Sequence, residues 1–199
     1  VRLDYNRDVF PNGPPNISVE IRGKNTILDP RSNAAGYSAN AALCVLDYLR
    51  SADGLACADD ENELDSFRAA ANICDEQEQN AAGGATQPRY HIGGSFTLDR
   101  APIEIMEELL GACGGTLVYV QGRYRLHVGA YGAPTDALTV SDLAGEIELQ
   151  TKAPRRELFN SVRGTFVDPT KNWQAADFPP VAGGAYVTED GGEAIWRDI

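Results

Sequence analysis

TLVYVQGRYRLHV, residues 116–128, decides the fold of the central part of the chain. Apolar side chains recur at every second position on both sides of Gln121-Gly122, which is the pattern of two strands joined by a two-residue turn. This turn pairs Tyr119 with Tyr124 and sets which side chains share a face. The face that we expect to be buried carries Leu117, Tyr119, Tyr124, Leu126 and Val128. The face that we expect to be wetter carries Val118, Val120, Arg123, Arg125 and His127.

The residues before this hairpin predict a strand and then a helix. Even spacing of large apolar side chains predicts a strand over residues 90–98, with a bulge at Gly93-Gly94. Asp99 can cap a helix over residues 102–113 that has Pro102 in its first turn. The hairpin should pack on this helix, which gives a small α/β layer. The inner face of the helix carries Ile103, Met106, Leu110 and Cys113.

Two further helices are predicted earlier in the chain, over residues 38–53 and 62–78. Either Ser38 or Asn40 can cap the first helix, and Asn62 begins a weak capping box for the second. Each helix has one apolar stripe, which predicts that the two helices share a core. The stripes are Ala42, Val45, Leu46 and Leu49 in the first helix, and Leu64, Phe67, Ala71 and Cys74 in the second.

Both ends of the chain carry short extended patterns. Residues 17–21 alternate apolar and polar side chains and predict a strand, which residues 26–28 follow as a return strand after a turn at 23–25. Residues 185–199 predict two short extended segments on either side of a turn at 190–192.

Residues 159–181, FNSVRGTFVDPTKNWQAADFPPV, begin as a strand that Gly164 interrupts and continue as a loop after Asp168-Pro169. The loop holds Trp173 and Phe178. Aromatic side chains in an irregular segment indicate a contact, either with the protein's own body or with a partner. The candidate interface therefore consists of Lys171, Asn172, Trp173 and Phe178.

The composition argues against several classes of function. Among the 199 residues there are 17 Lys and Arg and 29 Asp and Glu, so the formal net charge is −12. We expect no specific nucleic-acid partner, because that class needs a positive footprint. No apolar run approaches the roughly 20 residues that span a bilayer, so we expect no membrane segment. The missing initiator Met and the abrupt last residues predict an internal piece of a longer protein.

The four cysteines, Cys44, Cys57, Cys74 and Cys113, have no spacing typical of a metal site or a disulfide scaffold. Three of them fall on apolar helix faces, which predicts free thiols in a reducing compartment. The exception to consider is a bridge between Cys44 and Cys74, which requires that the two helices bring their Cα atoms within about 7 Å.

The sequence contains no constellation typical of an active site. Residues 93–97 resemble a nucleophile elbow, but Thr97 stands where the pattern needs Gly. Residues 59–70 begin like a calcium loop, but Leu64 takes the place of the required Gly. The two histidines lie far apart on predicted strands. We therefore predict no enzymatic activity, no catalytic residue, no cofactor and no metal ion.

The chain carries six stretches that together resemble a known family: VFPNGPPNISVEIRGKNTILDPR, YSANAALCVLDYLRSADGL, SFRAAANICDE, ELLGACGGTLVYVQGRYRLHVGAY, RRELFNSVRGTFVDPTKNWQAADFPPV and EDGGEAIWRDI. They cover nearly the whole chain, and their order and spacing make the resemblance specific although no single motif is long. The family is the central tail-tip hub of long-tailed bacteriophages, also called the tip attachment or host-specificity protein J family.

The resemblance implies a virion structural protein of a phage or prophage, located at the tail tip and, during assembly, in the host cytoplasm. The full-length protein is then a homotrimer that caps the tail tube, contacts other tail-tip and tail-tube proteins, and reaches the host receptor through regions absent here. The expected fold is α+β and multi-module, with parts of β-barrel-like hub modules flanking a small α/β module (strand, helix and hairpin, plus two preceding helices). The expected segments are 1–37 (end of a hub β module), 38–82 (two helices), 83–150 (α/β module with the hairpin) and 151–199 (start of a second hub β module).

Two other functions stay open at this point. One is a tail-associated cell-wall hydrolase, which requires acid and base groups that converge on a cleft. The other is a receptor- or carbohydrate-binding module that stacks sugars on Trp173, Trp196 or Tyr131. Binding to a glycan array or to host cells would distinguish the second alternative from a hub.

Overall fold

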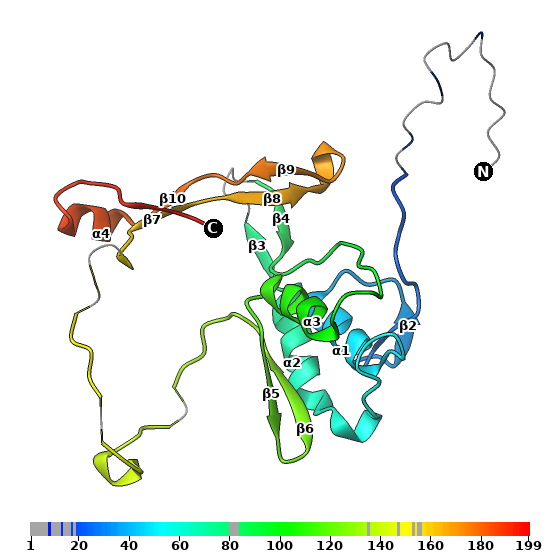
Figure 1. Cartoon of the computed structure of the whole chain (residues 1–199), viewed down its shortest axis with the longest axis horizontal. Coiled ribbons are helices and arrows are strands. Elements are labelled where there is room, and N and C mark those ends of the chain that lie inside the picture. The colour runs from blue at the N-terminus through cyan, green and yellow to red at the C-terminus, as the bar shows by residue number, and fades with distance from the viewer. Residues whose placement is uncertain are drawn as a thin grey trace. The chain divides into compact units, whose positions relative to one another are not determined.

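The computed structural model describes residues 8, 13, 17, 19–79, 84–134, 136–146, 148–152, 154 and 157–199 (Figure 1). The chain divides into two compact units, Val1–Gly132 (unit 1) and Ala133–Ile199 (unit 2). Each unit mixes helices with short strands, so the fold is α+β, as predicted. Among the described residues the strands form small open sheets, and none of these closes into a barrel.

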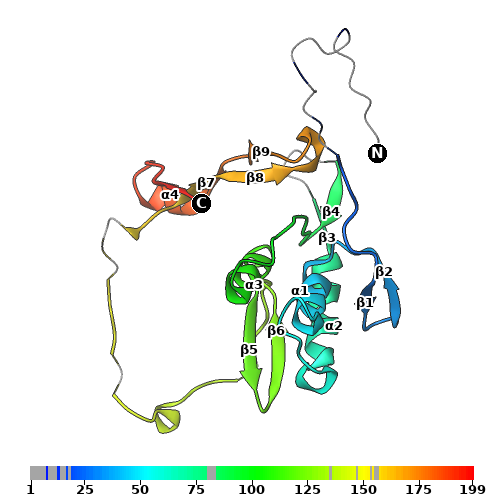
Figure 2. The same cartoon turned by 45° about the vertical axis from the view of Figure 1, so that its right-hand side comes forward.

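Unit 1 consists of hairpins packed around helices. The helix α1 packs against α2 and α3, and α2 packs against β6 (Figure 2). Each sheet in the described part of this unit is an antiparallel pair: β1 with β2, β3 with β4, and β5 with β6. The elements are β1 (Ile27–Asp29), β2 (Ala34–Gly36), α1 (Ala41–Arg50), the 3-10 turn η1 (Asp59–Glu61), α2 (Leu64–Asp75), β3 (Gln77–Gln79), β4 (Thr86–Pro88), α3 (Pro102–Gly111), β5 (Thr116–Val120) and β6 (Arg123–His127).

The core of unit 1 forms around α1, as its apolar stripe predicts. Asn40 is the N-cap, because its side-chain oxygen accepts a hydrogen bond from the N–H of Leu43 at 3.2 Å. Of the two predicted caps, Asn40 is thus the one in use. The predicted stripe of α1 is confirmed as buried, and Phe67, Ala71 and Cys74 of α2 are buried with it.

The predicted caps of the other two helices are wrong. The Nδ2 of Asn62 donates to the main-chain oxygen of Ala58 at 2.8 Å, and Glu63 takes the N-cap position of α2. Asp99 does not cap α3, whose N-cap is Ala101, although the predicted proline does occupy the first turn. Neither actual N-cap residue makes a side-chain capping bond, so packing rather than capping fixes these two helix starts.

Residues 90–98 form no strand, contrary to the prediction. The N–H of Tyr90 donates to the oxygen of Cys74 at 3.2 Å, and the N–H of Ile92 donates to the oxygen of Ala39 at 2.9 Å. These single bonds tie the segment to helix ends, so it does not run along another strand. Two of the apolar residues that defined the predicted strand are exposed, namely Phe96 and Leu98.

The predicted 116–128 hairpin is confirmed in position and register. Tyr119 lies opposite Tyr124, and Gln121 and Gly122 have φ of 53° and 80°, as a two-residue hairpin turn requires. The hairpin packs mainly on α2 and not on α3, which is the helix that the sequence predicted as its packing partner. Leu126 is buried, but Tyr119 is 58% exposed, because the hairpin tip extends beyond the helices. The other predicted inward residues are partly buried: Leu117, Tyr124 and Val128.

Two further apolar patterns near the core were predicted only in part. On the predicted inner face of α3, Met106 and Cys113 are buried and Leu110 is partly buried, but Ile103 is exposed and Ile105 is buried instead. Residues 17 and 19–26 form no strand, and residue 18 lies outside the described residues. β1 instead pairs forward with β2, because the oxygen of Asp29 accepts the N–H of Asn33 at 2.8 Å and closes a turn there. The exposed residues of this segment include Ile17, Val19 and Ile21.

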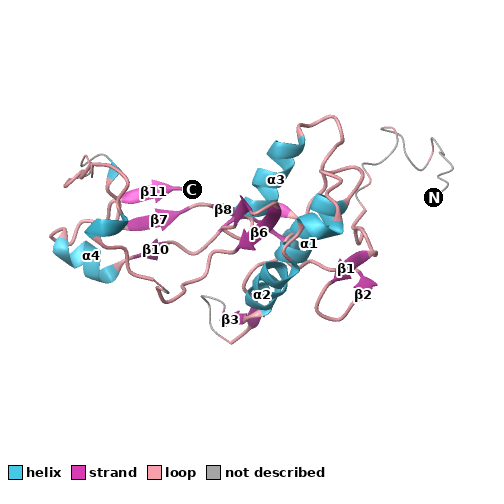
Figure 3. Ribbon diagram, turned by 90° about the horizontal axis from the view of Figure 1, so that it is seen from below, coloured by secondary structure: helices cyan, strands magenta, loops and turns pink. Residues whose placement is uncertain are grey.

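Unit 2 is built on one bent strand. β7 lies between an antiparallel β10 and a parallel β11 (Figure 3), and β8 pairs with β9. The predicted strand over 159–167 corresponds to β7 and β8, with the predicted interruption at Gly164. The elements are η2 (Val140–Asp142), β7 (Ser161–Arg163), β8 (Thr165–Asp168), η4 (Pro169–Lys171), β9 (Gln174–Asp177), β10 (Val181–Ala182), α4 (Gly184–Glu189) and β11 (Trp196–Asp198).

Two predictions for unit 2 are wrong. The loop expected after Asp168-Pro169 contains β9, whose register with β8 is set by the tight η4 turn. The first of the two extended segments expected in 185–199 is the helix α4. The expected turn is present, with Gly191 and Gly192 at φ of 76° and 87°, and the second extended segment is β11.

Asn160 ties the last part of unit 2 to β7. Its Nδ2 donates to Oδ2 of Asp190 at 2.8 Å and to the oxygen of Glu193 at 3.0 Å. Its Oδ1 accepts the N–H of Ile195 at 2.8 Å, and its main-chain oxygen accepts the N–H of Gly183 at 2.9 Å. One buried side chain thereby fixes both the turn after α4 and the start of β11.

Candidate functional site

The predicted interface begins at the turn between β8 and β9. The Oδ1 of Asp168 accepts hydrogen bonds from the N–H and the hydroxyl of Thr170, at 2.9 and 2.7 Å. The main-chain oxygen of Asp168 accepts the N–H of Trp173 at 3.1 Å. The Thr170 hydroxyl and N–H hold the pKa of the Asp168 carboxyl below its usual value. The carboxylate form therefore organises the turn that carries Lys171.

Asn172 and Trp173 both have positive φ, at 56° and 59°. This conformation is uncommon for a residue other than Gly and costs on the order of 1–3 kcal/mol, most of all for a bulky side chain. The bond from the N–H of Trp173 to the main-chain oxygen of Asp168 closes this turn, and the side chain of Trp173 remains 44% exposed. The chain thus places an exposed tryptophan at the end of a two-stranded ribbon.

Phe178 does not belong to this turn. It follows the far end of β9, where its N–H donates to the oxygen of Gly164 at 3.1 Å. Its Cε1 lies 2.8 Å from the position that a Cβ on Gly164 would take, so the half-buried ring covers the bend between β7 and β8. The structure brings Lys171, Asn172 and Trp173 together and places Phe178 at the other end of the ribbon.

Unit 2 buries very few side chains. Among its described residues, only Asn160, Ser161 and Ala176 are buried. Phe166 and Val167 are neighbours on β8, so their side chains point to opposite faces of the ribbon, where they are 46% and 55% exposed. Sequence reasoning did not assign these two residues a role, although adjacent apolar residues in a strand favour burial on both faces. The other large exposed apolar residues are Leu138, Val140, Leu143, Leu149, Leu158, Phe159, Trp173, Val181, Tyr186, Trp196 and Ile199.

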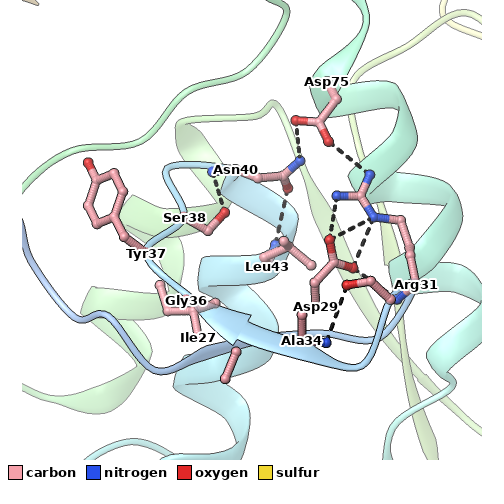
Figure 4. Close-up of a pocket in the computed structure, with 12 residues that line it drawn as sticks. Ile27, Asp29, Arg31, Ala34, Gly36, Tyr37, Ser38, Asn40, Leu43 and Asp75 are labelled. Carbon is pink, nitrogen blue, oxygen red and sulfur yellow. Dashed lines mark hydrogen bonds and ion pairs between the residues drawn. The ribbon is translucent and has the colours of Figure 1, made fainter.

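Unit 1 has an open depression of about 250 Å³ beside the start of α1 (Figure 4). Arg31 lies between two carboxylates there, with Nη2 at 2.7 Å from Asp29 and Nη1 at 2.8 Å from Asp75. The side-chain hydrogen bond from Arg31 lowers the pKa of Asp29, and the same bond raises the pKa of Arg31. Because these charged groups are paired with one another, they join β1 to the end of α2.

A second depression, of about 220 Å³, lies at the acidic segment before α2. Its aspartates are exposed and partly paired, since Asp59 is 2.8 Å from Arg50 and Asp65 is 2.7 Å from Arg68. The partly buried Glu63 lies 3.5 Å from Arg123. Within the described residues, no group of three or more His, Cys, Asp or Glu side chains is arranged to hold a metal ion.

The side chains that could start acid–base or nucleophilic chemistry lie on separate elements. His91 is exposed, and its main chain forms an isolated antiparallel β-bridge with that of Asn40. His127 is exposed at the end of β6. The four cysteines are free thiols, and Cys74 and Cys113 are buried. Burial raises the pKa of the Cys44 thiol to about 11, which keeps it protonated and a weak nucleophile.

None of the described helices combines the length and the apolar character needed to cross a membrane. Comparison of the sequence with models of protein families and with curated proteins found no matching family and no matching protein.

Proposed function

We propose that the chain is a structural part of a phage or prophage tail tip. In this function it belongs to the central hub that caps the tail tube and connects it to host-attachment regions. The six ordered stretches quoted above support the family, and unit 2 supports an assembly role. The chain acts as a scaffold, without catalytic groups, cofactor or metal.

The observation that carries the proposal is the exposed apolar surface of unit 2. A sheet is stable when at least one face packs on another layer, but the β8–β9 ribbon exposes Phe166 on one face and Val167 on the other. A free-standing enzyme or binding module needs a core of its own. A segment of a hub wall obtains that core from neighbouring modules and subunits.

The partners follow from the same function. The full-length protein forms a homotrimer, meets other tail-tip and tail-tube proteins, and reaches the host receptor through other regions. Lys171, Asn172 and Trp173 lie at a module or subunit contact at the end of the ribbon. The net charge of −12 suits a hub through which DNA must pass, because carboxylates along the channel repel phosphates.

Sedimentation of the full-length protein at several concentrations tests the trimer. We expect a trimer mass and, by electron microscopy, a three-fold ring; a stable monomer or dimer would overturn the hub. Trp173→Ala should weaken the trimer, whereas Tyr131→Ala, at a residue that is 93% exposed outside the ribbon, should not. Peptidoglycan cleavage by the purified chain, abolished by a single carboxylate substitution, would instead establish a hydrolase.

A further inference from the structure

The two edges of the β5–β6 hairpin differ in their hydrogen bonding. On β6, the oxygen of Tyr124 accepts the N–H of Glu63 at 2.9 Å, and the N–H of Leu126 donates to Oγ of Ser66 at 3.2 Å. The start of α2 therefore covers the outer edge of β6. Figures 1 and 2 show the same arrangement, with β6 between β5 and α2.

Within the described residues, the outer edge of β5 has no such cover. Leu117 lies opposite Leu126 and Tyr119 lies opposite Tyr124. Because the main-chain groups of Leu126 and Tyr124 face away from β5, those of Leu117 and Tyr119 face away from β6. In the part of the chain that the structure describes, no residue hydrogen-bonds to the main-chain N–H or C=O of either residue. Two donors and two acceptors are thus presented along this edge.

β5 also lacks the features that keep an edge strand from pairing. Its sequence, TLVYV, has no charge and no proline, and its register with β6 is unbroken by a bulge. Val118 and Val120 are each 37% exposed. A strand of this kind is a template for the addition of another strand.

One face of the hairpin is cationic in a strongly acidic chain. Arg125 makes no ion pair within the described residues, and its Nε is buried without a hydrogen-bond partner. Arg123 reaches the Glu63 carboxylate only at 3.5 Å. Arg123 thus extends toward the start of α2, so Arg125 is the cation that a strand added beside β5, about 10 Å from β6, can meet. The cationic residues, which alternate along β6, are Arg123, Arg125 and His127.

We propose that the outer edge of β5 docks an extended acidic segment of another protein. The segment adds a third strand to the hairpin through the main-chain groups of Leu117 and Tyr119. A carboxylate of the segment meets Arg125 on the cationic face. Main-chain bonds supply affinity, and Arg125 selects acidic sequences. This site lies in unit 1 and does not rest on the proposed hub function.

Charge decides between this partner and a second copy of the chain. Two β5 edges that pair antiparallel are related by a two-fold axis perpendicular to the sheet. Both copies then place their arginines and His127 on the same face of the four-stranded sheet. Such a pairing gives Arg125 no carboxylate partner, whereas an acidic strand does.

Fluorescence anisotropy with a labelled peptide of alternating glutamate and valine tests the site on the whole chain. We expect saturable binding of this peptide. A peptide of alternating lysine and valine should bind with an affinity at least about tenfold lower. An alternating glutamate–valine peptide in which every main-chain nitrogen is methylated keeps its charges but has no N–H to donate on either edge, so it should not bind. Equal binding of the methylated or the lysine peptide would overturn the proposal.

Two protein variants locate the site. Arg125→Glu should weaken the binding of the glutamate peptide about tenfold, whereas Lys152→Glu, with the same change in net charge at an exposed residue of unit 2, should leave binding unchanged. Tyr119→Pro removes the outward N–H, together with the ring that contacts Tyr124, and should abolish binding. Circular dichroism checks its fold, Tyr119→Ala controls for the loss of the ring, and the methylated peptide replaces the proline variant if it unfolds. If both charge variants lose the same amount of peptide affinity, the binding site does not lie at Arg125 and the proposal is wrong. A concentration-dependent dimer that Tyr119→Pro abolishes assigns the edge to a second copy instead.

Discussion

Asn40 and Asp75 join the start of α1 to the end of α2, with 2.9 Å between Nδ2 of Asn40 and Oδ1 of Asp75. The same Nδ2 donates to the oxygen of Ala71 at 2.9 Å, while the Asn40 Oδ1 caps α1 through Leu43. The other carboxylate oxygen of Asp75 receives Arg31 (Figure 4). One carboxamide thus satisfies groups on two helices and positions the carboxylate that holds β1.

Asn40→Ala should lower the free energy of unfolding of unit 1 by about 2–3 kcal/mol, because a cap and a buried interhelical bond are lost together. Urea unfolding followed by far-ultraviolet circular dichroism measures the change. Asn40→Asp keeps the capping oxygen but removes the donor. Its free energy of unfolding should therefore lie between those of Asn40→Ala and the unchanged protein. Full stability of Asn40→Asp would show that Asn40 acts as a cap alone.

Leu126→Ala should cost about 2–4 kcal/mol, because Leu126 is 2% exposed and packs between the hairpin and α2. Tyr119→Ala, on the same predicted face, should cost below about 1 kcal/mol, since the tyrosine is 58% exposed. Denaturant unfolding of both variants checks the pair. Equal costs would mean that the hairpin tip is buried.

Gly164→Ala should loosen β11. The new Cβ would lie 2.1 Å from the main-chain oxygen of Ile199 and 2.8 Å from the ring of Phe178, so the β11 end must move. Gly184→Ala, at the start of α4, meets no atom within 4 Å and should be neutral or slightly stabilising. Amide exchange measures both. The N–H of Ile199, bonded to Arg163 at 3.0 Å, should exchange faster only in Gly164→Ala.

Stability should fall as the pH rises through the range in which thiols ionise. Burial raises the pKa of Cys44 from 9.0 to about 11 in the folded chain, so the unfolded chain releases its proton first. The thiol's contribution is intact below about pH 9 and is lost toward about pH 11, a change of about 2–3 kcal/mol. Urea unfolding at several pH values gives the slope, and Cys44→Ser should flatten it. If the slope of the unfolding free energy against pH is unchanged in Cys44→Ser, the Cys44 thiol is exposed to solvent in the folded chain.

The parts of the fold that the sequence predicted are those determined within a short stretch of chain. The hairpin follows from one turn, Gln121-Gly122, and the three helices of unit 1 follow from apolar residues at helical spacing. Residues 90–98 have the alternation of a strand, but a strand also needs a neighbour, and the neighbours here are the ends of two helices. β9 was missed because Ala175 and Ala176 have low β propensity and the η4 turn determines their pairing.

The candidate site was predictable to a similar extent. An exposed Trp173 could be expected from its polar surroundings, but its positive φ could not, because bonds to Asp168 impose it. Phe178 was grouped with Trp173 because the two are near in sequence, and the intervening strand separates them. The open edge of β5 had no sequence signal either, since only tertiary packing decides which edge of a hairpin α2 covers.

Because unit 2 buries few side chains, its folding should depend on the concentration of the partner that binds it. With three buried residues among those described, the unit gains little from the hydrophobic effect when it stands alone. We expect calorimetry of the isolated chain to show one cooperative transition, that of unit 1. The melting point of unit 2 should rise with the concentration of whatever protein covers Phe166 and Val167. Unit 1 is then ordered before assembly, and unit 2 gains most of its stability at the moment of docking.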